Sequence, residues 1–186
     1  MVEFLSGKLL IASPYLNDPN FMRSVVLIVS HDDEGAFGLS LNRPTDQKLS
    51  EVVELSMAKG AVRDDDLIYE GGPVDGPLLA LHDLSGIGSP IGQETSDVWI
   101  TGEEDHLRLL LTRVDAKVRF VAQYSGWGPG QLDAEMESGG WLVGRADHDV
   151  VFDDPEQVWE SAVKRCGREV LSSLSPGLRF NDPSVN

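Results

Sequence analysis

Cysteine is nearly absent from this chain, because Cys166 is the single cysteine among 186 residues. One cysteine forms no disulfide within the chain and supplies no CxxC pair for metal binding or redox chemistry. Long apolar runs are absent too, since no stretch reaches the ~18 apolar residues of a membrane helix. We therefore predict a cytoplasmic protein with no membrane segment, no metal site and no cofactor.

Basic residues are scarce: 15 lysines and arginines stand against 31 acidic residues, which gives a formal net charge of -16. A protein that binds duplex DNA normally presents a basic stripe, because phosphate neutralisation supplies most of the non-specific affinity. The longest basic concentration consists of Lys164, Arg165 and Arg168, and the acids Glu156, Glu160 and Glu169 surround it. Direct DNA binding is therefore disfavoured, and no helix-turn-helix pattern supports it.

Reaction signatures are missing as well. Gly71-Gly72-Pro73 lacks the spacing and the lysine of a P-loop, and the sequence around Ser125 is not a G-x-S-x-G nucleophile elbow. The histidines at positions 31, 82, 106 and 148 are scattered, and no pair has the helical spacing of a metal site. The sequence predicts no catalytic residue and leaves open whether the protein is an enzyme.

Short apolar runs alternate with turn-forming residues along the chain. Runs bounded by Gly, Pro or Asp predict strands, and apolar positions at i, i+3 and i+4 predict helices. The runs at 25–29 and 37–41 predict an antiparallel hairpin. Other strands are predicted at 9–12, 67–69, 78–81, 98–100, 118–122, 141–143 and 150–152, and helices at 48–59, after 101, from 131, and from 155 until Gly167 ends the last one.

Five sequence blocks follow one another in a recognisable order. They are LIASPYLNDPNFMRSVVLIVSHDDEGAFGLSLNRP, EGGPV, LALH, YSGWGPGQLDAEMESGGWLV and VFDDPEQVWESAVKRCG. Together they cover roughly residues 7–167 and resemble the AlgH/YqgE family of bacterial proteins. Where the family pattern has glycine, tyrosine and alanine, this chain has Gln123, Tyr124 and Ser125.

The resemblance implies an α+β fold in which a bifurcated, largely antiparallel sheet curls into a pseudo-barrel with flanking helices. It transfers no catalytic residue, because none is established for the family, whose members are often labelled transcriptional regulators. We predict a single domain of this kind over residues 1–171 and a loosely attached C-terminal tail over residues 172–186.

Arg23, Asn42 and Arg43 lie at predicted strand ends. The planar guanidinium suits a carboxylate or a phosphate, so these residues are candidates for binding an anion. The alternative is structural: each side chain anchors a neighbouring carbonyl or acidic group, as arginines in networks often do.

Two glycine-rich segments are further candidates. Gly71 and Gly72 could bring backbone N–H groups close to an anion, or they could simply form a tight turn. Trp127 beside Gln131 would suit stacking on a planar ligand if the indole is exposed. The alternative is that Trp127 fills the core while Gln131 caps the turn.

From these observations we predict a regulatory or binding module for a small anionic ligand or a protein partner. Two alternatives stay open: a transcriptional regulator, as the family label says, and an enzyme that acts on a phosphorylated or nucleotide substrate. The sequence does not predict an oligomeric state. The candidate ligand-binding residues are Arg23, Asn42, Arg43, Gly71, Gly72, Trp127 and Gln131.

Overall fold

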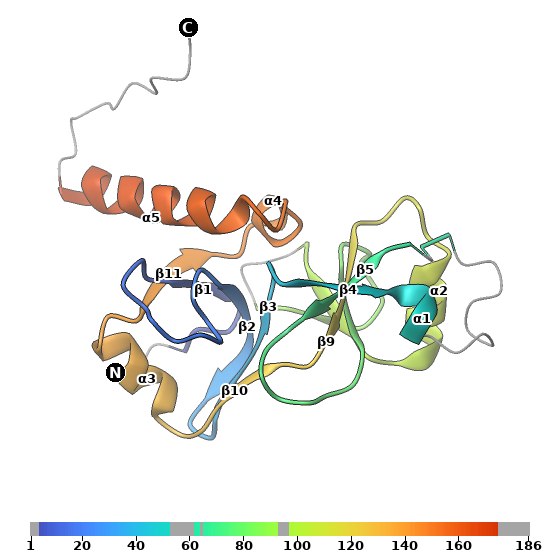
Figure 1. The fold of residues 1–186 in the computed structure, drawn as a ribbon, viewed down its shortest axis with the longest axis horizontal. Helices are drawn as coiled ribbons and strands as arrows, with labels where there is room; N and C mark the ends of the chain where they lie inside the picture. Colours follow the sequence, from blue (N-terminus) through green and yellow to red (C-terminus); the bar gives the residue numbers. More distant parts are fainter. Residues whose placement is uncertain (1–3, 53–61, 64, 93–96, 175–186) are drawn as a thin grey trace, which may run out of the picture.

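The computed structural model describes residues 4–52, 62–63, 65–92 and 97–174. Within these ranges the chain forms an α+β fold of two mostly antiparallel sheets with several helices (Figure 1). The α+β class and the antiparallel character predicted from the sequence are thus confirmed. The prediction of a curled pseudo-barrel is wrong for the described residues, because their strands form two open sheets.

Sheet A has the strand order β10-β3-β2-β1-β11, with every pairing antiparallel. Its centre, β2, carries a run of β-branched and leucine side chains that are fully buried, which is typical of a strand covered on both faces. The predicted hairpin is formed by β2 and β3. The strands are β1 (Lys8–Ala12), β2 (Val25–Asp32), β3 (Gly35–Ser40), β10 (Ser125–Trp127) and β11 (Trp141–Arg145).

Sheet B has the strand order β4-β5-β9-β6-β8-β7, and its only parallel pair among the described residues is β5 with β9. It is built from the continuous stretch between β3 and β10. Its strands are β4 (Pro44–Lys48), β5 (Leu67–Glu70), β6 (Leu79–His82), β7 (Ser89–Pro90), β8 (Trp99–Thr101) and β9 (Val118–Ala122).

Helices cover both faces of sheet A and one face of sheet B. Helix α5 (Val158–Leu174) lies over one face of sheet A and α3 (Gln131–Glu137) over the other, while α1 (Leu49–Val52) and α2 (Glu104–Leu111) accompany sheet B (Figure 1). The largest core joins residues of both sheets with the α5 residues Val158 and Ala162. Apolar burial between the two sheets and α5 therefore holds the fold together.

Three predicted elements need correction or restriction. Residues 150–152 were expected to form a strand, but His148–Val151 form the short helix α4. Gly167 does not end the last helix, which continues to Leu174, past the start of the predicted tail at residue 172. Most of the helix predicted at 48–59 lies outside the described residues, as do tail residues 175–186.

Candidate functional site

Asn42 and Arg43 bind the backbone that leads into β2. The Asn42 side chain accepts the Val25 N–H at 2.9 Å and donates to the Arg23 carbonyl at 2.8 Å. The Arg43 Nε donates to Ser24 Oγ at 3.0 Å. Asn42 thus contacts a neighbouring carbonyl, and Arg43 Nη2 also donates to the Met22 carbonyl at 3.4 Å, which are contacts of the kind that the structural alternative named.

Arg23 is held in an unusual backbone conformation. Its φ is 58°, in the left-handed region that L-residues with a Cβ seldom adopt. Its guanidinium carbon lies 5.0 Å from the ring centroid of Trp159 on α5, a cation–π arrangement. Among the described residues, neither Arg23 nor Arg43 has a carboxylate within ion-pair distance.

Gly71 and Gly72 lie tightly against the segment that joins β9 to β10. A Cβ at Gly72 would stand 2.3 Å from Ser125 Oγ, and one at Gly71 would stand 2.4 Å from the Gln123 carbonyl oxygen. The Gly71 carbonyl accepts hydrogen bonds from Ser40 N–H at 2.8 Å and from Ser125 Oγ at 3.1 Å. Close packing of backbone on backbone thus accounts for glycine at both positions.

Trp127 is buried, with 5% of its surface exposed, so the exposed indole that ring stacking on a ligand would require is absent. Its ring stacks on Phe21 and meets Trp141 edge to face. The Nε1 groups of both tryptophans donate to Glu135 Oε2 at 3.0 Å. Gln131 Oε1 accepts the Gly128 N–H at 3.1 Å and so caps the turn.

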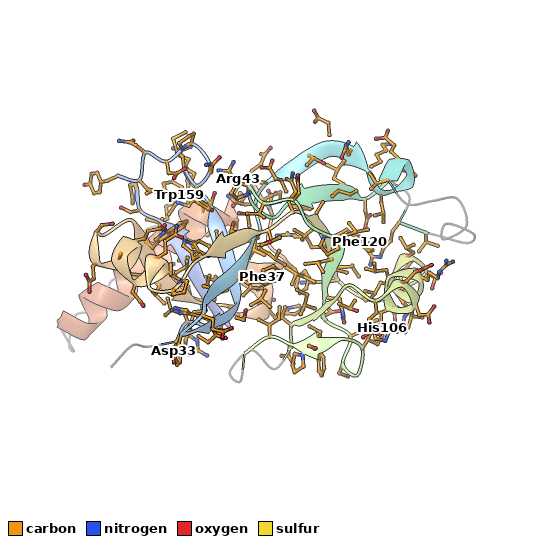
Figure 2. The ribbon with its side chains drawn as sticks, turned by 90° about the horizontal axis from the view of Figure 1, so that it is seen from below. Asp33, Phe37, Arg43, His106, Phe120 and Trp159 are labelled. Atoms are coloured by element: carbon orange, nitrogen blue, oxygen red, sulfur yellow. The ribbon has the colours of Figure 1, made fainter. Side chains whose placement is uncertain are left out.

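Two of the predicted residues, Trp127 and Arg23, lie on opposite faces of sheet A rather than in one cleft. Trp127 belongs to the core on the α3 face of sheet A. Trp159, over which Arg23 lies, packs against the core on the α5 face. In Figure 2, Trp159 lies in the part of the molecule that contains sheet A, whereas Phe120 and His106 lie in the part that contains sheet B.

A cleft of about 480 Å³ opens instead beside β5 and β9, where Phe152 closes it from the segment between α4 and α5. This volume falls in the range of small-molecule sites. Its charged lining consists of Arg63, Asp66, Lys117 and Arg119, and its apolar lining includes Leu67, Tyr69, Val118 and Phe152. We call this feature the arginine cleft.

Arg119 is the unusual member of the arginine cleft, because only 6% of it is exposed. Its Nη1 donates to the Leu41 carbonyl, its Nη2 donates to the Asp153 carbonyl at 2.8 Å, and its guanidinium lies 4.5 Å from the Tyr69 ring centroid. Burial lowers the pKa of Arg119, against the opposing influence of Tyr69 and Asp153. An arginine nevertheless stays charged in proteins, so this site holds a desolvated cation.

Positive charge predominates in the arginine cleft. Arg63 pairs with Asp66 at 2.8 Å, and its other nitrogens donate to the carbonyls of Arg113 and Ala116. Among the described residues, Lys117 and Arg119 have no carboxylate within ion-pair distance. Two unmatched cations in one cleft of a protein with net charge -16 favour an anionic occupant.

Sequence reasoning missed Arg119 because charged residues alternate with apolar ones in β9, a pattern that does not show which side of the strand is buried. One signal was present. Val121 lies two residues further on the same side of the strand as Arg119, and both are buried. An apolar residue two positions from a charged one in a strand indicates that their shared side of the strand is covered.

Two absences can be stated for the described ranges. No helix there is long and apolar enough to cross a membrane. In the same part of the chain, no group of three or more His, Cys, Asp or Glu side chains is placed to hold a metal ion.

The fold and the arginine cleft together define an α+β protein with two mostly antiparallel sheets and a cationic pocket at the flank of the second sheet. A family model described as AlgH-like matches residues 9–171. The chain therefore belongs to the AlgH-like family, which confirms the resemblance seen in the sequence.

Individual relatives agree with this membership. A UPF0301 protein from Streptomyces avermitilis is 35% identical over 201 residues, covering 100% of this chain and 97% of the relative. A second, from Ruegeria pomeroyi, is 38% identical over 90% of this chain and 94% of its own length. The solution structure of the AlgH protein from Pseudomonas aeruginosa is similar with a TM-score of 0.72 and 32% identity, covering 97% of this chain and 100% of that one.

Proposed function

We propose that this protein is a binding module for a small organic anion and that the arginine cleft is its ligand site. Arg119 is the observation that carries the proposal. A buried guanidinium has five N–H donors, and two carbonyls occupy only part of this capacity. Because desolvation strengthens its charge interactions, a carboxylate or phosphate reaching Arg119 would bind far more strongly than at an exposed arginine.

The remaining lining indicates what else the ligand carries. Tyr69, Leu67 and Phe152 supply apolar surface next to the charged groups. Lys117 is exposed and can approach the anionic group from the solvent side. An anionic group attached to an apolar body matches this division, which is the usual pattern of small-molecule pockets.

The alternative that the protein is an enzyme has no support from the contacts in the arginine cleft. Asp66, the one carboxylate of the lining within the described chain, is engaged by Arg63. No histidine, serine or cysteine of the described residues lines the cleft. A binding role therefore fits this site better than turnover, because a nucleophile activated by a neighbouring base is missing.

The test is an amide NMR titration of labelled protein with inorganic phosphate, benzoate, phenyl phosphate and adenosine monophosphate. We expect at least one of these probes to shift the amides of Tyr69, Lys117, Arg119 and Phe152. The shifts should vanish in Arg119→Met and persist in Arg108→Met, a matched change on α2. The proposal fails if no probe moves these amides, or if Arg119→Met keeps its fold and still responds.

A further inference from the structure

The loop between β1 and β2, residues 13–24, displays large apolar side chains to solvent. Tyr15 is 89% exposed and Met22 is 58% exposed. Arg23 follows directly and is exposed as well. Tyr, Met and Arg are residue types enriched in the contact regions of protein interfaces, and Tyr and Arg are frequent among their energetic hot spots.

This loop is anchored along its length. Ser13 N–H donates to the Gly140 carbonyl at 2.9 Å, and Met22 N–H donates to the Asp18 carbonyl at 2.8 Å. Beneath the surface, Phe21 stacks on Trp127 with ring centroids 5.9 Å apart. The exposed side chains therefore stand on a fixed backbone, which lowers the entropy lost when a partner binds.

The charge beside the apolar side chains is positive. Arg23 lies on Trp159, and Arg43 contacts Ser24 Oγ at 3.0 Å and the Met22 carbonyl at 3.4 Å. Both guanidiniums lack a carboxylate partner within the described ranges, whereas Arg63, Arg108 and Arg113 each have one. In a chain with 31 acidic residues, the lack of an ion-pair partner within the described ranges leaves these two arginines available for an acidic group from another molecule.

The backbone at Arg23 also supports a role for this side chain in binding an acidic group from another molecule. Its left-handed φ of 58° carries strain, and Asn42 fixes it by binding the carbonyl of Arg23 and the N–H of Val25. The strained turn sets the direction in which the Arg23 side chain leaves the loop. The acid within the loop, Asp18, accepts the Asn20 N–H at 2.8 Å and so has a local role.

We propose that Tyr15, Met22, Arg23 and Arg43 form a docking surface for an acidic peptide segment of a partner protein. The segment would place an apolar side chain against Tyr15 and Met22 and a carboxylate near Arg23 and Arg43. This surface is separate from the arginine cleft. Segment 41–43 joins them, because the Leu41 carbonyl accepts from Arg119 while Arg43 contacts the loop.

The experiment is a selection from a phage-displayed library of random peptides against the full chain, followed by affinity measurements on the enriched peptides. We expect a consensus that combines Asp or Glu with a large apolar residue. Arg23→Glu and Met22→Ser should each weaken binding about tenfold or more, because each removes one half of the recognition. Lys164→Glu on α5 and Val114→Ser on the surface are the matched charge and apolar controls, and both should bind as the unchanged chain does.

Three results would overturn the docking surface. They are the absence of enrichment, a neutral or basic consensus, and acidic peptides that all four variants bind equally. A duplex DNA titration at two salt concentrations forms a separate arm. If the duplex binds and Arg23→Glu abolishes this binding, the surface belongs to nucleic acid and the peptide proposal is wrong.

Discussion

Replacing Arg119 by methionine separates a ligand-binding arginine from a structural one. The change removes two hydrogen bonds from a charged donor to the Leu41 and Asp153 carbonyls, about 1.5 to 3 kcal/mol each. It also removes the stacking on Tyr69, about 2 kcal/mol for a desolvated cation. Two contributions favour the variant. The penalty of several kcal/mol for burying a charged group disappears, and a buried apolar side chain is gained.

These opposing contributions are of similar size, so we expect the free energy of unfolding to change by less than about 2 kcal/mol. Urea unfolding followed by circular dichroism measures this change. Leu81→Ala, in the core between the sheets, provides a scale and should cost about 2 to 5 kcal/mol. A loss above about 4 kcal/mol in Arg119→Met would refute the reasoning, because Arg119 would then be needed for the fold itself.

Three more predictions concern stability. Glu135→Ala leaves the Nε1 groups of Trp127 and Trp141 without their acceptor, so urea unfolding should show a loss of about 2 to 4 kcal/mol, and an unchanged midpoint would contradict it. Gln123→Gly relieves a φ of 62° and should stabilise the protein by about 0.5 to 1 kcal/mol in the same assay, whereas a loss would show that the left-handed conformation is unstrained. Burial lowers the pKa of His82, with Asp83 opposing, so the unfolded chain binds more protons and stability should fall as pH drops below about 6.5. Unfolding midpoints at about pH 7.5 and about pH 5.5 should therefore differ less in His82→Leu than in the unchanged chain, and an equal difference would exclude His82 as the cause.

Strands with continuous apolar runs could be predicted because burial leaves a direct mark on composition. The run from Val25 to Val29 falls within β2, and its hairpin with β3 formed as expected. The run from Val150 to Phe152 is also wholly apolar but lies largely in α4. Three apolar residues fit a strand or one helical turn equally well, and only the neighbouring elements decide between them.

The site was harder to predict because it depends on contacts between distant segments. Nothing near Trp127 in the sequence shows that Phe21 and Trp141 enclose its ring. Likewise, Arg119 becomes a buried cation only because Leu41 and Asp153, far away in the chain, turn their carbonyls toward it. By contrast, the glycine that the family pattern has at position 123 did indicate the backbone conformation there. Gln123 adopts a left-handed φ, which glycine takes up without strain.

The segment that forms sheet B is an insertion between two strands of sheet A, β3 and β10. Its strands come from the single stretch 44–122, while sheet A is assembled from residues 8–40 and 125–145. Pro44 pairs with Tyr69, and Tyr69 pairs with Val121, so the two ends of the stretch lie two strand spacings apart, about 10 Å. A single recombination event could therefore replace the whole inserted segment 44–122 without changing the strand order of sheet A. The new segment would have to present an apolar face that matches the one around Leu81 and Val121. Because every lining residue of the arginine cleft except Phe152 belongs to this inserted segment, such a replacement would change the ligand. The docking surface of the 13–24 loop would stay, because it lies outside the segment.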